Sequence, residues 1–243
     1  MSSQCLFLCL CIFICSYGHA TGNLVPFIDK CVWNDENCLV ASTQKAIPYF
    51  AKGLPEFGLE PMDPLKMNKV TLAEGELKVE FTDMEVTGTS KCKILKVTRD
   101  ITKNHLKLVA ECPIDVVGNY DASGKLLFTP IDGNGPFHVN CKLIHIEVSV
   151  DVNTVAGPDG VGYWKIGKNT HSYEAKEKCT FDFQNLFNGD KEKAQPILDI
   201  FNEAWKEIME SVCKPIVHEV LDEIVNHVQT FSSKVPAEQL EIL

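Results

Sequence analysis

The sequence predicts an α+β fold in which one long C-terminal α-helix is wrapped by a highly curved antiparallel β-sheet. Two observations predict it. Apolar and polar residues alternate in short runs over residues 69–183, as in half-buried strands, and apolar residues recur at helical spacing over residues 191–231. Because a sheet that curls around a helix encloses the space between them, we expect one elongated apolar cavity.

The N-terminal residues are typical of a secretory signal. The run over residues 5–17 is almost wholly apolar, and Gly18 and Ala20 supply the small residues of a signal-peptidase site. A membrane anchor is the alternative, but this run is short for a bilayer span. The sequence therefore predicts a signal peptide over residues 1–20, a single domain over residues 21–243 and a secreted, extracellular protein.

Composition narrows the classes of partner. The 243 residues are 45% apolar and 23% charged, which is typical of a globular protein with its own core. The net charge of −10 excludes nucleic acid as a partner and disfavours an anionic membrane surface, because both need clustered positive charge. No second long apolar run follows the first, so we expect no stable membrane insertion.

The cysteines outside the predicted signal are disulfide candidates, because an extracellular compartment is oxidising. Cys31 and Cys38 enclose a short polar segment and form the clearest pair, and Cys179 and Cys213 form the second candidate pair. Of the other three, the first two could form a cross-strand bridge if the chain turns near Thr102, and an odd thiol is left free or paired between chains. These three are Cys92, Cys112 and Cys141.

The segment after the first cysteine pair predicts a helix followed by an irregular strap. Helical spacing of apolar residues covers residues 36–51, with Pro48 marking a bend or a stop. Residues 52–65 contain several prolines, and the residue before a proline favours extended geometry. Since a proline-broken backbone can move without disrupting a sheet, residues 36–65 are the candidate gate to the interior.

The middle of the chain predicts antiparallel strands joined by short turns. The apolar positions over residues 137–143 share one face, and those over residues 144–152 continue on the other parity. This change at Leu143 and Ile144 predicts a β-bulge. Short links between strands favour antiparallel pairing over a parallel α/β sheet. The turn signals are residues 121–124, 132–136 and 157–160.

The last third predicts one helix about 60 Å long, at 1.5 Å per residue. Its apolar stripe drifts at a period near 3.6 and not 3.5, which favours packing against the sheet over a coiled coil. Pro215 has no N–H to donate and should kink this helix.

Signals for catalysis are weak. His218 and Glu219 begin like a zinc-protease helix, but Asp222 stands where the second histidine is required. Residues 162–168 imitate a phosphate-binding loop, but Asn169 replaces the Ser or Thr that would hold magnesium. No nucleophile elbow is present. We therefore expect no enzyme, no catalytic residue, no metal site and no cofactor.

Several short segments form a set that covers essentially the whole chain after the predicted signal. They are Cys31-x6-Cys38, residues 52–55 and 61–65, residues 118–135, Leu186–Asp190, Asn202–Lys206 and Lys234–Pro236. In this order they resemble the insect haemolymph juvenile-hormone-binding protein and takeout family. The resemblance implies a tubular lipid-binding-like domain with a buried tunnel for small apolar ligands. Such ligands are juvenile hormone, other terpenoids, fatty acyl compounds or quinones.

The resemblance also bears on the disulfides and on the branch of the family. It implies the Cys31–Cys38 bond across the whole family, and Cys179–Cys213 resembles the second bond of the hormone-binding branch. Takeout members often lack that second bond, and the region around Trp205 is closer to takeout. Both branches, and with them the ligand, stay open.

Two hypotheses on function follow. The first is a secreted, non-enzymatic carrier in haemolymph or another extracellular fluid, with a small hydrophobic ligand as its partner and any receptor unknown. The alternative is a ligand-free extracellular interaction protein with a filled core that acts through a protein partner. Periodicity does not separate the two, because buried apolar residues mostly pack. The candidate lining residues are Phe201, Trp205, Ile208, Met209 and Val212 from the helix, with Phe137, Val139 and Val148 from the sheet.

Overall fold

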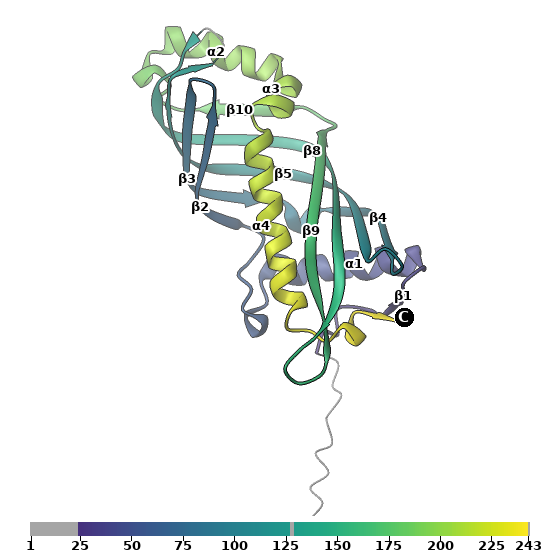
Figure 1. Cartoon of the computed structure of the whole chain (residues 1–243). Helices are drawn as coiled ribbons and strands as arrows, with labels where there is room; N and C mark the ends of the chain where they lie inside the picture. The colour runs from purple at the N-terminus through teal and green to yellow at the C-terminus, as the bar shows by residue number, and fades with distance from the viewer. Residues whose placement is uncertain (1–23, 127–128, 243) are drawn as a thin grey trace, which may run out of the picture.

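The protein has an α+β architecture in which a curved sheet wraps around one helix (Figure 1). The structure is a computed structural model that describes residues 24–126 and 129–242, so the predicted signal peptide over residues 1–20 lies outside the described residues. In the described chain, seven strands form the main sheet, and helix α4 (Lys214–Ser232) lies along its concave side. The strands are β2 (Leu65–Glu74), β3 (Leu77–Thr87), β4 (Lys93–Asp100), β5 (His105–Ser123), β8 (Gly133–Ala156), β9 (Gly162–Ala175) and β10 (Cys179–Phe183).

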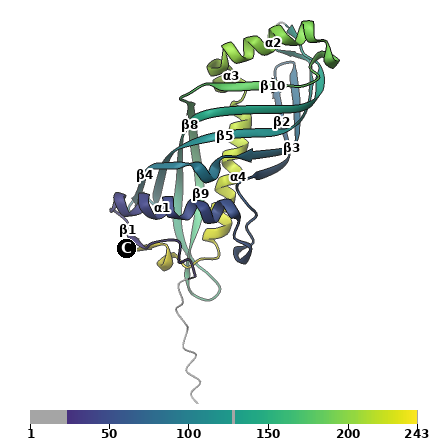
Figure 2. The same ribbon diagram turned by 180° about the vertical axis from the view of Figure 1, so that it is seen from behind.

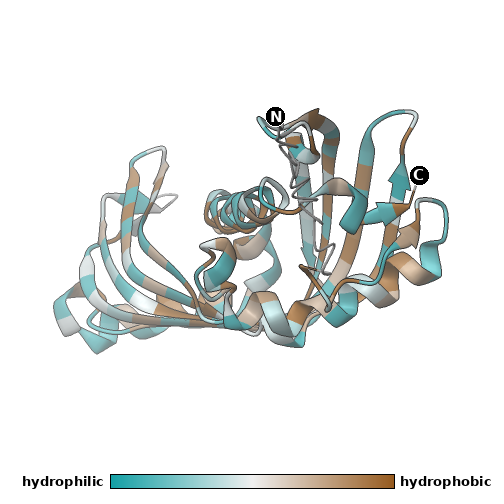
Figure 3. Ribbon diagram, turned by 90° about the horizontal axis from the view of Figure 1, so that it is seen from below, coloured by the Kyte–Doolittle hydropathy of each residue, from teal (hydrophilic) through white to brown (hydrophobic). Residues whose placement is uncertain are grey.

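Two long strands, β5 and β8, organise the sheet because each pairs with different neighbours along its two halves. The first half of β5 pairs with β4 and the second half with β3, which also pairs with β2. The first half of β8 pairs with β10 and the second half with β9. All these pairs are antiparallel, as predicted. Seen from below, the sheet curves on both sides of a helix viewed nearly end-on, and hydrophobic and hydrophilic residues alternate along the strands (Figure 3).

The predicted β-bulge lies in the middle of β8. Cys112 pairs with Ile144 and Ile114 with Cys141, so β8 has one residue more than β5 between these two pairs. Pro113, which has no N–H group to donate, occupies the interrupted position of β5. Because a bulge bends a strand and increases its twist, this one helps to curl the sheet where its two halves meet.

One predicted turn is confirmed and two are wrong. Residues 157–160 join β8 to β9, whereas residues 121–123 are the end of strand β5 and pair with β3. Residues 132–136 form no turn, because β8 begins among them. Gly133 and Gly135 have positive φ, and a Cβ on either would lie 2.9 Å from the backbone that follows β10. These glycines therefore permit a close approach between two backbones.

The described C-terminal segment forms three helices, so the prediction of one long helix is wrong. α2 (Lys191–Glu203) and α3 (Trp205–Ser211) lie across the upper end of the sheet, whereas α4 runs down its concave side (Figure 1). Breaks at Ala204 and near Cys213 separate them. Pro215 does not kink a helix; it lies in the first turn of α4, where no N–H donor is needed.

The N-terminal helix and the strap agree with the sequence. Helix α1 (Glu36–Lys52) continues through Pro48, and at its start the Asp35 carboxylate accepts a hydrogen bond from the Cys38 N–H at 3.0 Å. The segment between α1 and β2 is irregular apart from a 3-10 helix at Pro55–Phe57. α1 lies across the lower end of the sheet beside β4 (Figure 2).

Short elements complete the fold. They are β1 (Cys31–Val32), β6 (Lys125–Leu126), β7 (Thr129–Pro130), β11 (Glu241–Ile242) and 3-10 helices at Thr89–Lys91, Phe187–Gly189 and Ala237–Gln239. β1 pairs in parallel with β11, so the first and last described strands are neighbours. We call the end of the molecule formed by β1, α1 and β11 the base end. No helix in the described part of the chain is long and apolar enough to cross a membrane.

Two disulfides follow the sequence interpretation. Cys31 is bonded to Cys38, as predicted. Cys92 is bonded to Cys112 across the β4–β5 hairpin, which turns at residues 101–104 as this pairing requires. The first bond holds the start of α1 against β1, and the second ties β5 to the segment before β4.

The predicted Cys179–Cys213 bond is wrong. The register of β10 on β8 places Cys179 directly opposite Cys141, and these two cysteines are bonded to each other. Cys213 lies at the break between α3 and α4 and is the free cysteine of the described chain. Disulfide pairing follows strand register here, which cysteine spacing does not reveal.

Candidate functional site

A cavity of about 460 Å³ lies between α4 and the inner face of the sheet, with α1 as part of its cover. We call it the main cavity. Its walls come mainly from α1, α4 and the inward-facing positions of β3, β4, β5, β8 and β10, with single residues from β9 and α3, and they are almost wholly apolar. α4 supplies a row of lining residues along its length: Ile216, Val217, Val220, Leu221, Ile224, Val228, Phe231 and Ser232.

The structure divides the predicted lining residues among three places. Four of them line the main cavity, namely Phe137, Val139, Val148 and Met209. Phe201, Ile208 and Val212 instead line a second cavity of about 70 Å³ at the upper end, and Trp205 lines neither. Trp205 packs against the buried cluster around the Cys141–Cys179 disulfide. These residues do not line the main cavity because the predicted helix is broken, so that α2 and α3 lie across the upper end of the sheet and not along its concave side.

Several lining residues were not predicted as such. Ile47 and Phe50 of α1 line the main cavity, as do Ile94 of β4 and Val220 and Ile224 of α4. The signal for the α4 residues was present, since they belong to the apolar stripe of the helix. No signal distinguished the α1 residues from an ordinary packing face.

A wall of side chains that we call the partition separates the two cavities. Phe183 is at its centre, with its ring stacked on Phe137 at 5.9 Å between centroids and edge-on to Tyr120 at 5.0 Å. The free Cys213 also belongs to it, and burial raises the pKa of its thiol to about 12. The members line both cavities: Phe81, Phe181, Phe183, Cys213 and Ile216.

Helix α2 holds one member of the partition through its backbone. The Phe181 N–H donates to Asn202 Oδ1 at 2.9 Å, and Asn202 Nδ2 donates to the Phe181 carbonyl at 2.8 Å. β10 is an edge strand of the sheet, so these two bonds replace those that a further strand would make. α2 therefore positions β10 and the partition together.

Polar groups are few around the main cavity, and most are already paired. Ser42 Oγ accepts from the Asp29 N–H and donates to the Asp29 carbonyl, both at 2.9 Å. Thr89 Oγ1 donates to the Met62 carbonyl at 2.6 Å. The described residues that line this cavity include no lysine, arginine or histidine.

A buried ion pair closes the base end. Arg99 Nε lies 3.0 Å from Glu241 Oε2, and the two side chains are 4% and 5% exposed. The Trp164 indole N–H donates to Glu241 Oε1 at 3.1 Å, and the Arg99 guanidinium lies 5.7 Å from the Trp164 ring centroid. Because Trp164 lines the main cavity, this network fixes part of the cavity wall.

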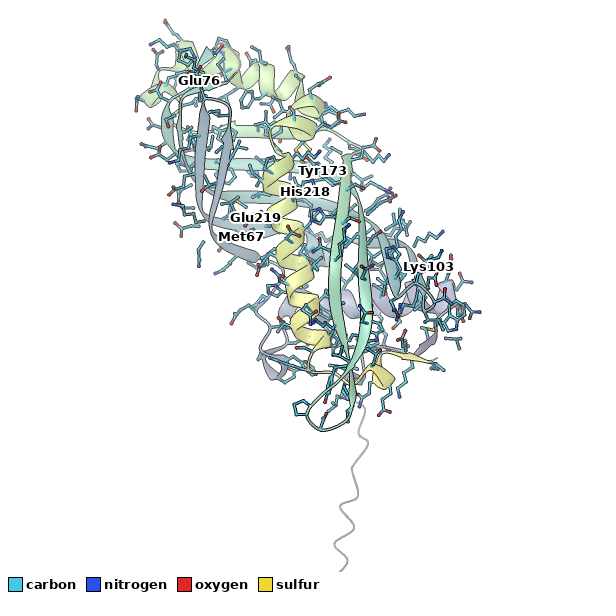
Figure 4. All side chains as sticks on the ribbon, viewed as in Figure 1. Met67, Glu76, Lys103, Tyr173, His218 and Glu219 are labelled. Carbon is cyan, nitrogen blue, oxygen red and sulfur yellow. A yellow bond between two sulfur atoms is a disulfide. The ribbon has the colours of Figure 1, made fainter. Side chains whose placement is uncertain are left out.

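Two histidines meet where β9 packs on α4. Their rings, from His171 and His218, have centroids 4.4 Å apart, and His171 Nε2 lies 3.1 Å from Asp222 Oδ1. Tyr173 and His218 lie near each other across this seam (Figure 4). Burial, the neighbouring His171 and Lys214 lower the pKa of His218. No group of three side chains suited to hold a metal ion occurs among the described residues.

Comparison with known proteins decides the family. The family model of the haemolymph juvenile hormone binding protein (JHBP) matches residues 6–241. The chain belongs to the JHBP family. The crystal structure of Takeout 1 from Epiphyas postvittana superposes with a TM-score of 0.85 and 29% identity, over 89% of this chain and 100% of that one.

Curated relatives of this JHBP-family chain are insect proteins. The circadian clock-controlled protein daywake of Drosophila melanogaster is 26% identical over 193 residues, 73% of each chain. A putative beta-carotene-binding protein of Schistocerca gregaria is 30% identical over 129 residues, 52% of each chain. The juvenile hormone-binding protein of Manduca sexta is 27% identical over 151 residues, which are 60% of this chain and 64% of that one.

These comparisons confirm the family resemblance and the fold class predicted from the sequence. In this JHBP-family chain the curved sheet and the helix along its concave side are those of the takeout fold. The Cys31–Cys38 bond agrees with the one that the resemblance implies across the family, whereas the Cys141–Cys179 bond replaces the expected Cys179–Cys213 bond.

Proposed function

We propose that this JHBP-family protein is a secreted carrier that binds a small hydrophobic ligand in the main cavity. The observation that carries the proposal is the cavity itself, about 460 Å³ with walls almost wholly apolar. Ligand pockets commonly have volumes of about 300–1,000 Å³ and bury most of the ligand. Each Å² of apolar surface that a ligand buries there contributes roughly 25 cal/mol to binding.

The ligand class follows from the cavity and from the relatives. One relative is named as a juvenile hormone-binding protein and another as a putative beta-carotene-binding protein. Both names describe isoprenoid ligands. We propose juvenile hormone or another terpenoid as the first ligand to test, with fatty acyl and quinone-like lipids after it.

Secretion is part of the proposal. Its support is the apolar run that predicts a signal peptide over residues 1–20, ahead of a single domain over residues 21–243, and the three disulfides, which persist in oxidising compartments. The name of the family model, which refers to haemolymph, agrees with an extracellular fluid.

We propose a carrier and not an enzyme, because the hydroxyls at the cavity have no neighbouring base. A serine or threonine nucleophile needs an adjacent group that takes its proton. The described lining residues offer neither histidine nor lysine, and the carboxylate of Asp29 is bound to Lys45 at 2.7 Å. The alternative of a filled core has no observation in its favour, since the interior is hollow.

Residues 36–65 remain our proposed gate. Helix α1 supplies one side of the main cavity through Leu39, Ile47 and Phe50. Its start is held by the Cys31–Cys38 disulfide, so movement of the cover would take place at its far end.

The test is native mass spectrometry of the secreted protein, followed by organic extraction and competition of the bound species with juvenile hormone. We expect one apolar ligand per chain, and its displacement by hormone would select the hormone-binding branch. Val220→Trp fills the main cavity and should abolish loading, whereas Val117→Trp, at a 40% exposed position, is the matched control and should load normally. An empty protein that also rejects hormone, fatty acids and quinones would contradict the proposal.

A further inference from the structure

The lining row of α4 contains one polar residue. Ile216, Val220, Ile224 and Val228 follow one another at the i, i+4 spacing that places side chains on one face of a helix, and Ser232 is the next position of that row. Ser232 is 2% exposed and lines the main cavity at the base end. A hydroxyl therefore stands where the pattern calls for an aliphatic side chain.

The Ser232 hydroxyl is also without a partner. Within residues 24–126 and 129–242, no backbone or side-chain group makes a hydrogen bond to it, although the neighbouring Ser233 hydroxyl donates to the Thr230 carbonyl at 2.8 Å. Ser42 and Thr89, which line the same cavity, are both paired, and Thr43 of α1, which also lines it, is only half-buried, unlike Ser232. A hydroxyl that faces an apolar cavity gains a hydrogen bond only from a partner inside that cavity, so its presence in this wall needs a reason.

The end of the main cavity opposite Ser232 offers no comparable hydroxyl among the described residues. From Ile216 of the partition to Ser232, α4 advances sixteen residues, about 24 Å at 1.5 Å per residue. The partition there is built of aromatic and aliphatic side chains around Phe183. The main cavity is thus a long, narrow space with a hydroxyl at one end and a hydrocarbon wall at the other.

We propose that the cavity binds its ligand in one direction. A neutral oxygen-bearing head group, such as an alcohol or ester, makes a hydrogen bond with Ser232, and the hydrocarbon tail lies along α4 and ends at the partition. The partition thereby limits tail length. The head group is uncharged, because the described lining residues provide no cation to compensate a buried carboxylate. This inference rests on the proposed carrier function.

The head group is tested by displacement of a naphthylamine dye with hexadecanol, hexadecane and hexadecanoate. The Ser232→Ala variant should lose about 2- to 12-fold affinity for hexadecanol, the effect of one neutral hydrogen bond, and none for hexadecane. Ser42→Ala is the matched control, because the Ser42 hydroxyl lines the same cavity but is already paired. In this variant the ratio of the affinity for hexadecanol to that for hexadecane should stay at the wild-type value. Equal losses for alcohol and alkane in Ser232→Ala, or stronger binding of hexadecanoate than of hexadecanol, would overturn the assignment.

The tail is tested with a series of primary alcohols from dodecanol to docosanol. Affinity should rise about fourfold for each added methylene until the tail reaches the partition, and then fall. We call the chain length at which affinity stops rising the break. Ile216→Ala opens the wall towards the second cavity and should move this break to longer alcohols. Ile197→Ala, which lines the second cavity alone, should leave it in place.

Phe183→Leu is a second, milder change in the partition and should move the break in the same direction as Ile216→Ala. A break that stays at the same alcohol in both variants would overturn the role of the partition. Failure of the carrier function itself is distinguishable, because the wild-type protein would then bind neither the dye nor any alcohol.

Discussion

The two ends of the main cavity are closed by different kinds of interaction. At the base end, Arg99, Glu241 and Trp164 form a buried polar network. At the upper end, the partition consists mainly of aromatic rings, such as Phe183 against Phe137. Charge pairs are directional and leave a buried charge when one partner is lost, whereas apolar contacts tolerate a change of volume. We therefore expect substitutions at the base end to act mainly on stability and substitutions in the partition to act mainly on the depth of the cavity.

The largest effect is expected at the base end. Arg99→Met leaves the Glu241 carboxylate buried without its partner and should lower the free energy of unfolding by about 3–5 kcal/mol. Denaturant unfolding with the disulfides intact measures this. The double variant Arg99→Met with Glu241→Leu should recover most of the loss. A loss below about 1 kcal/mol in the single variant, as for a surface pair, would show that the two ends do not differ in this way.

A smaller effect is expected at the upper end. Trp205→Ala should lower the free energy of unfolding by about 3 kcal/mol, the low end for a large aromatic residue, because Trp205 is only half-buried. Ligand affinity should stay unchanged, since Trp205 lines neither cavity. Met209→Trp, in contrast, should reduce affinity because Met209 lines the main cavity. Thermal unfolding and dye displacement separate the two effects; reduced affinity in Trp205→Ala would place that residue at the ligand.

The bonds from α2 to β10 should contribute less. Asn202→Ala removes the side chain that pairs with the Phe181 backbone and should cost about 1–3 kcal/mol. Hydrogen exchange at the Phe181 amide should become faster, while exchange in the β3–β5 pairing stays slow. Unchanged exchange at Phe181 would mean that α2 does not hold the edge of the sheet.

The smallest effect is the pH dependence of the seam between β9 and α4. His218 faces His171 and Tyr173 of β9 and Lys214 and Asp222 of its own helix. Burial, His171 and Lys214 lower the pKa of His218 below the ordinary 6.5, and this effect exceeds the opposite effect of Asp222.

Folding therefore favours neutral His218, and the stability that this provides is present above pH 6.5 and is lost as pH falls through the lowered folded pKa. Unfolding curves between about pH 7 and pH 5 should show a shallower decline in His218→Gln than in the wild type. His105→Gln on β5 is the control, and an equal slope in all three proteins would contradict this role.

The sequence predicts most of the sheet because strand alternation is a local property. The change of parity at Leu143 and Ile144 even locates the bulge, since an extra residue must reverse the faces of a strand. Pairing across the sheet is not local. Cys179 of β10 lies opposite Cys141 of β8. These two strands are neighbours in the sheet, but β9 lies between them in the sequence, so the sequence did not reveal their pairing and the expected Cys179–Cys213 bond was wrong.

The sequence predicts an apolar cavity between the helix and the sheet, but it does not predict where this cavity ends. The apolar stripe continues through Ala204 and Cys213, where the helix breaks, because the residues beyond each break still face apolar neighbours. Phe201 and Met209 therefore look alike in the sequence but line different cavities. Hollow and filled interiors also share one pattern, since Val220 is apolar for either purpose. Ser232 was overlooked because a serine at the end of a helix is ordinary.

The parallel pairing of β1 with β11 sets an order of events during synthesis. A ribosome delivers the chain from its N-terminus, so Cys31 emerges long before Glu241. β1 has no partner strand during that interval, and Arg99 has no counter-charge until Glu241 arrives. The base end, with the Ser232 side of the cavity, therefore closes after the rest of the sheet. A ligand meets a complete binding space only once Glu241 has joined Arg99 at the base end.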